Sequence, residues 1–165
     1  MGAELSRRTF LRGRFREPRP LRPPWAEEEK LFAARCDGCG ECLRQCPEGI
    51  LVARSDRTPE VDFTRGECTF CGACADHCTR SALARGGDSA SAWSLKAVIG
   101  EGCLAKKGVV CQACGEQCEP RALRFRMGKG GRSLPHLDDS ACTGCGACVA
   151  PCPVQAVTIE PQGQD

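Results

Sequence analysis

Sixteen cysteines in a chain of 165 residues fall into four runs whose spacing suits the binding of iron–sulfur clusters. Three of the runs read C-x2-C-x2-C-x3-C, a pattern typical of loops that hold [4Fe–4S] cubanes. Three closely spaced thiolates in such a loop bind one cubane, and the fourth cysteine reaches a neighbouring one. A proline follows two of these runs, at Pro47 and Pro153. The runs are Cys36, Cys39, Cys42 and Cys46; Cys68, Cys71, Cys74 and Cys78; Cys103, Cys111, Cys114 and Cys118; and Cys142, Cys145, Cys148 and Cys152.

Zinc binding and disulfide formation are the two alternative uses of these cysteines. All-cysteine zinc sites usually combine two C-x2-4-C pairs across a longer gap, whereas here three cysteines are packed closely with a fourth just behind. A disulfide scaffold would require export, and the N-terminus lacks the apolar stretch of a secretory signal. No apolar run of 18 residues occurs anywhere, so no membrane span is expected. Thiolate-bound metal in a reducing cytoplasm fits best.

The composition and the repeat of the runs predict small, metal-stapled modules. Six Phe, two Trp and no Tyr cannot fill a large apolar core. The first cysteines of the runs lie at 36, 68, 103 and 142, which indicates four copies of one small unit. Because a two-cluster module uses two units, the sequence predicts an α+β protein with two tandem bacterial-type ferredoxin-like modules and an extended basic N-terminal arm.

The predicted boundaries are an Arg/Pro-rich arm at 1–29, module one at 30–86 and module two at 93–160, with a Gly/Ser-rich linker from Gly86 to Ala92. Hairpins are expected over 50–63 and 122–137, inside the modules, which favours sequential pairing of the runs. Nested pairing, of run one with four and two with three, stays open. In each unit we expect a turn of helix that carries the last cysteine, and glycines with positive φ between ligands: Gly38, Gly40, Gly72, Gly144 and Gly146.

The ligand sets follow from the rule that, in two-cluster ferredoxins, the fourth cysteine of each run binds the other cluster. Carried over to this chain, the rule predicts four [4Fe–4S] clusters. Cluster one takes Cys36, Cys39, Cys42 and Cys78; cluster two takes Cys68, Cys71, Cys74 and Cys46; cluster three takes Cys103, Cys111, Cys114 and Cys152; and cluster four takes Cys142, Cys145, Cys148 and Cys118.

Two departures from the regular pattern have expected consequences. Thr79 replaces proline after run two, which should loosen the turn without removing a ligand. Run three has seven residues between its first two cysteines, and this loop brings Lys106 and Lys107 near cluster three. These cations would raise the potential of the cluster or offer a docking point, unless the loop is simply a solvated insertion.

Charge is divided between a basic arm and an acidic body. Residues 1–25 carry seven Arg against two Glu, whereas the whole chain has a net charge of only +2, so the remainder sums to −3. Such a body is not expected to bind nucleic acid. Ser6 to Arg12 read SRRTFLR, close to a twin-arginine export motif, but the apolar stretch that such a signal needs does not follow.

The chain resembles the NapF family, the ferredoxin-type proteins of periplasmic nitrate reductase systems. The resemblance rests on the N-terminal SRRTFLRG, the four runs in order, the stretch IGEGCLA, the stretched third run and CEPRALRF after it. It implies a cytoplasmic protein with four [4Fe–4S] clusters that acts on the catalytic subunit of periplasmic nitrate reductase before export, in cluster loading or electron supply.

The residues show no constellation of catalytic acid, base or nucleophile, so we expect a non-enzymatic protein. Two alternatives stay open. One is a polyferredoxin subunit that transfers electrons within a membrane oxidoreductase. The other is a chaperone in which clusters serve only to hold the fold.

Overall fold

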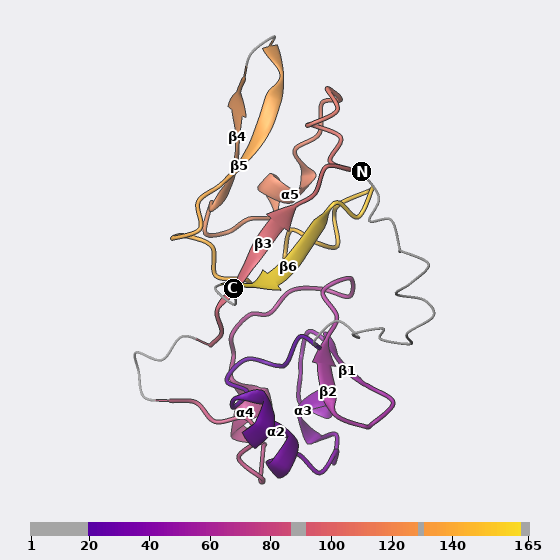
Figure 1. Ribbon diagram of the computed structural model, residues 1–165, viewed down its shortest axis with the longest axis vertical. Helices are drawn as coiled ribbons and strands as arrows, with labels where there is room; N and C mark the ends of the chain where they lie inside the picture. Colours follow the sequence, from indigo (N-terminus) through magenta and orange to yellow (C-terminus); the bar gives the residue numbers. More distant parts are fainter. Residues whose placement is uncertain (1–19, 87–91, 129–130, 163–165) are drawn as a thin grey trace, which may run out of the picture.

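The computed structural model describes residues 20–86, 92–128 and 131–162, and divides them between two halves (Figure 1). The lower half contains α2 (Glu29–Arg35), α3 (Glu41–Arg44), β1 (Leu51–Ala53), β2 (Pro59–Val61) and α4 (Ala73–Asp76). The upper half contains β3 (Leu95–Ile99), α5 (Ala113–Glu116), β4 (Leu123–Met127), β5 (Ser133–Leu137) and β6 (Val157–Pro161). We call the halves module one and module two. Most of the predicted arm, residues 1–19, lies outside the described residues.

Three antiparallel pairs of strands organise the modules. β1 pairs with β2 in module one, with Leu51 opposite Val61, and β4 pairs with β5 in module two, with Leu123 opposite Leu137. Both predicted hairpins are therefore confirmed, although β2 begins at Pro59, a residue expected in the turn. The sequence analysis did not predict the third pair, in which β3 and β6 join the two ends of module two.

The short helices of the cysteine runs start at glycine in module one and carry the third cysteine of the run. Gly40 and Gly72 precede α3 and α4 in the left-handed conformation, with φ of 76° and 82°. Such a conformation strains any residue with a Cβ, which explains the glycines. The buried cysteines of α3, α4 and α5 are Cys42, Cys74 and Cys114. The expectation that the helix carries the last cysteine was wrong, because each helix ends before that residue.

The apolar core is small and continuous between the modules. Phe32 is fully buried, and Ile50 and Leu123 are almost so. Buried and half-buried cysteines contribute to the same cluster of side chains, so sulfur supplies part of the core. The modules meet at aromatic rings, where Phe63 and Phe70 approach Trp93 edge-on, with ring centroids 5.9 and 5.5 Å away. Trp93 thus packs at the contact between the modules.

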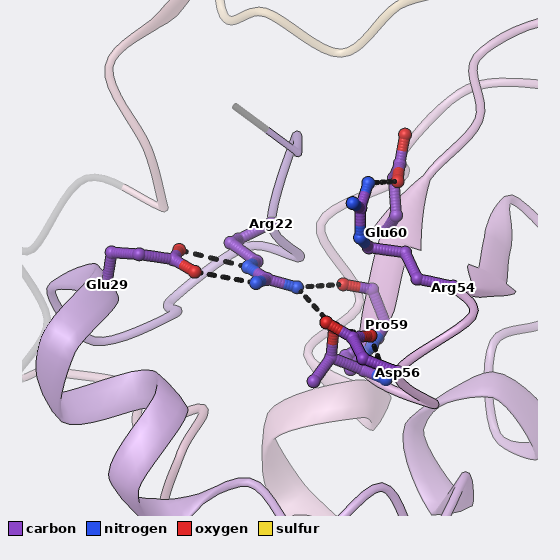
Figure 2. A network of polar contacts seen from close by, with 7 residues as sticks. Arg22, Glu29, Arg54, Asp56, Pro59 and Glu60 are labelled. Atoms are coloured by element: carbon purple, nitrogen blue, oxygen red, sulfur yellow. Dashed lines mark hydrogen bonds and ion pairs between the residues drawn. The ribbon is translucent and has the colours of Figure 1, made fainter. Parts of the chain in front are cut away.

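A polar network ties the start of the described chain to module one (Figure 2). The Arg22 guanidinium donates two hydrogen bonds to the Glu29 carboxylate, at 2.6 and 3.0 Å. It also donates to Thr58 Oγ1 and Pro59 O, at 2.8 and 3.0 Å. The guanidinium carbon, Cζ, lies 4.5 Å from the centre of the Phe32 ring. Arg22 therefore joins α2 to the β1–β2 hairpin and covers the most buried ring of the core.

Candidate iron–sulfur sites

All sixteen cysteines lie within the described residues, and none of them forms a disulfide. The third cysteine of every run is buried, at Cys42, Cys74, Cys114 and Cys148. Cys39 and Cys71, the second cysteines of runs one and two, are exposed. Runs one and two thus reach from the surface of module one into its interior, whereas the cysteines of runs three and four are all buried or half-buried.

In module one, four predicted ligands of one cluster line a single hollow. Cys36, Cys39 and Cys42 of run one face it together with Cys78 from run two. Phe32 and Leu83 supply apolar wall. Burial raises the pKa of Cys42 to about 12, and the neighbouring cysteines add to the shift. The fourth cysteine of run two therefore lies with the first three of run one, as the crossing rule requires.

Module two contains a second hollow of the same kind. Its walls include Cys142, Cys145 and Cys148 of run four together with Cys118 of run three. Leu123 and Ile159 line it from β4 and β6. Burial raises the pKa of Cys148 to about 12. In both modules, therefore, the fourth cysteine of one run lies at the hollow of the partner run.

For the two other predicted sets, of clusters two and three, the cysteines that lie near the buried thiol are identified by their effect on its pKa. Burial raises the pKa of Cys74 to about 12, and neighbouring Cys68, Cys46 and Cys71 raise it further. Burial likewise raises the pKa of Cys114 to about 11, with Cys103, Cys152 and Cys111 as the neighbours that add to it. The structure therefore brings Cys46 to run two and Cys152 to run three.

Backbone amides point at the sulfur of three fourth cysteines. The amides of Leu83 and Leu123 donate to Cys78 Sγ and Cys118 Sγ, both at 3.4 Å, and the amide of Ala156 donates to Cys152 Sγ at 3.2 Å. Hydrogen bonds to sulfur are one means by which proteins set the potential of iron–sulfur clusters. These amides orient the three sulfurs and would help to set the potential of a cluster bound there.

The donor chemistry fits [4Fe–4S] clusters. In each of the two hollows, four thiols lie at an apolar wall. The raised pKa values mean that a buried thiol keeps its proton until iron binds, so cluster binding releases protons. Across 20–86, 92–128 and 131–162, no three side chains of His, Cys, Asp or Glu are arranged to hold a single metal ion. No helix in these ranges is long and apolar enough to cross a bilayer.

The five glycines that were predicted to adopt positive φ all do so, with values from 71° to 84°.

The two lysines of the stretched loop in run three differ in their surroundings. Lys106 donates to Ile99 O at the end of β3 and to Glu101, both at 2.8 Å, so its charge is held by residues just before run three, whereas Lys107 is exposed. The longer loop still leaves Cys103 buried beside Cys114.

Lys96 is among the cations at the sites that sequence reasoning missed. Lys96 in β3 donates from Nζ to Cys142 O, at 2.5 Å, and so brings a positive charge to run four. Lys96 lies 46 residues before Cys142, and only the β3–β6 pairing, which leaves no local trace in the sequence, brings β3 to this run.

Comparisons with known proteins agree with the geometry. A family model described as a 4Fe-4S dicluster domain matches residues 35–82 and again 109–156. The second match begins after Cys103, inside the stretched loop of run three. The chain therefore carries two dicluster domains, and its sixteen cysteines are consistent with four [4Fe–4S] clusters.

Similarity over the full length narrows this class. The chain is 40% identical to the ferredoxin-type protein NapF of Escherichia coli, over 97% of both chains. It is 41% identical to NapF of Haemophilus influenzae, over 94% of this chain and 93% of that one. Ferredoxin-type protein NapG of Escherichia coli is more distant, 33% identical over 85% of this chain and 69% of its own. The chain belongs to the NapF family of ferredoxin-type proteins.

Proposed function

We propose that the sixteen cysteines hold four cubanes in the crossed sets predicted above. The support is the two hollows, each lined by three cysteines of one run and the last cysteine of its partner. In each set at least one thiol is buried from water, and in three of the sets a backbone amide also orients the sulfur of the fourth cysteine. The clusters, once bound, supply reversible one-electron exchange.

The crossing is tested by replacing Cys46 with Ser and, as a matched control, Cys78 with Ser. Each variant should lose one cluster, so that iron and sulfide fall from about 16 to about 12 per chain. Loss of cluster two frees the thiols of Cys68, Cys71 and Cys74, so anaerobic alkylation and mass spectrometry should find these modified in Cys46→Ser. The Cys78 variant should instead expose Cys36, Cys39 and Cys42. If each variant exposes the other cysteines of its own run, the crossed assignment is wrong.

The function that the site supports best is electron supply or cluster loading for the catalytic subunit of periplasmic nitrate reductase. The supporting observation is a chain of the NapF family with four cysteine sets held in two modules. Action before export places the protein in the cytoplasm. The two hollows and their cysteines support the coarser part of this proposal, a protein that carries several electrons.

Anaerobic affinity purification from cells that express the nitrate reductase tests this function. We expect the catalytic subunit, still bearing its export signal, to co-purify with the cluster-loaded protein. The catalytic subunit should contain less iron in cells that lack the protein. Recovery of a quinone-linked membrane subunit instead would favour the membrane oxidoreductase alternative. If the clusters resist reversible one-electron reduction, a purely structural role becomes the better account.

A further inference from the structure

The contact between the two modules is made by cysteine runs two and four. The backbone amide of Cys68 donates a hydrogen bond to Cys145 O, at 2.8 Å. Among the described residues, this is the one backbone hydrogen bond that joins a run of module one to a run of module two. It places the first cysteine of run two against the second cysteine of run four.

The side chains around this hydrogen bond fit each other closely. Gly146 follows Cys145 with φ of +84°, and a Cβ at this position would overlap the Phe63 ring. Phe63 comes from module one, just before run two, and is only 5% exposed. The ring of module one therefore occupies the space that the missing side chain of run four leaves.

Trp93 completes the contact from module two. Its indole Nε1 donates to Thr143 O, at 3.0 Å, and so fixes the ring against run four. The same ring receives the edges of Phe63 and Phe70, which flank the start of run two. Next to it, the amide of Trp25 in module one donates to Ala92 O, at 2.7 Å. Aromatic packing thus supports the contact on both sides of the hydrogen bond.

We propose that Phe63, Trp93 and Gly146 are positioning residues that hold cluster sets two and four side by side. The inference rests on the ligand sets proposed above. The four sets are then connected in the order one, two, four, three, which differs from their order in the sequence. With clusters bound, sets two and four would be the pair through which an electron crosses between the modules: one cluster would be oxidised by one electron and the other reduced by one, with no bond broken or formed.

The proposal is tested on the isolated holoprotein, without a partner. The double variant Phe63→Ala/Trp93→Ala removes the aromatic contact but no cysteine. The matched control is Phe125→Ala, since Phe125 packs on Gly115 beside run three, within one module. Iron and sulfide content, amide exchange at Cys68, radius of gyration and spin–spin broadening in the EPR spectrum of the reduced protein are measured for each.

The double variant should keep its iron, yet exchange the Cys68 amide about tenfold faster as the contact opens. Its radius of gyration should increase and the spin coupling between modules should weaken, whereas the control should match the wild type. Unchanged exchange and spectrum in an iron-loaded double variant would overturn the positioning role. If the double variant loses iron, amide exchange is measured on the wild-type protein instead. Fast exchange of the Cys68 amide would refute the contact between the modules, and slow exchange would support it. Failure of the crossed ligand sets would appear separately, in the Cys46 and Cys78 variants.

Discussion

The two modules hold the same kind of cysteine loop but close around it differently. In module two, β3 and β6 pair over five residues and join the ends of the module. In module one the corresponding closure is an isolated bridge between Ala26 and Leu83. Module one adds instead α2 and the Arg22 network that ties it to the hairpin. A cysteine loop therefore fixes its own geometry locally, and the closure of the module is free to vary.

The comparison predicts that module one depends most on Phe32. Phe32→Ala removes a fully buried ring from the wall of the first hollow, which should cost about 3–5 kcal/mol. Because module two has its own strand pairs, iron should fall to about half of the roughly 16 atoms expected per chain. Iron analysis and visible absorbance of anaerobically purified protein measure this.

The matched control is Leu31→Ala in the same helix, since Leu31 is 39% exposed and should keep full iron content. If Phe32→Ala empties both modules equally, the modules are one cooperative unit and the contrast between them has no energetic meaning.

A smaller effect is expected from the polar closure of module one. Arg22→Met keeps the aliphatic stem but removes the bonds to Glu29, Thr58 and Pro59. The Arg22 side chain is only 13% exposed, while Glu29 is 52% exposed, so we expect a loss of about 1–2 kcal/mol after allowance for screening. Chemical denaturation of the holoprotein, followed at the absorbance of the clusters, gives the change in stability.

Arg80→Met serves as the control, because Arg80 and Asp37 form a loose exposed pair at 3.7 Å. That variant should lie within about 1 kcal/mol of the wild type. Equal losses in the two variants would mean that the Arg22 network contributes nothing specific to closure.

The smallest effect concerns the turn after run two. Thr79 starts a turn at the position that Pro47 and Pro153 occupy after runs one and four. Thr79→Pro should therefore be accepted and stabilise module one by about 0.4–1 kcal/mol, because it restricts the unfolded chain. The same denaturation experiment detects it. Destabilisation would show that the turn after run two differs from the others, and that the threonine is required there.

The sequence was sufficient wherever the determinant is local. The spacing of the cysteines predicted the grouping of Cys78 with run one and of Cys118 with run four, and the glycine positions predicted the positive φ values. Both hairpins followed from short β-prone segments around turn residues. The binding of clusters by these sets stays a prediction, although the thiols are gathered as it requires.

What the sequence did not predict depends on partners far along the chain. The β3–β6 pair joins segments about sixty residues apart, and no pattern within either segment indicates which strand it pairs with. The burial of Phe32 under Arg22, and the fit of Phe63 to Gly146, depend likewise on how whole modules pack. In the sequence, Gly146 is explained by the positive φ that the cysteine loop needs. That its missing side chain also leaves space for the Phe63 ring is visible only in the structure.

The crossing of the fourth cysteines has a consequence for the growing chain on the ribosome. The hollow of Cys36, Cys39 and Cys42 lacks its last wall until Cys78 has been synthesised. The same holds in module two, where the hollow that Cys118 lines is incomplete until the run that begins at Cys142 has been synthesised. Since nascent domains fold as units from the N-terminus, module one can complete its sites while module two is still being translated. If the sets bind clusters as proposed, a loop with three thiols and no fourth ligand would exist during this interval, and a reducing environment would then matter most.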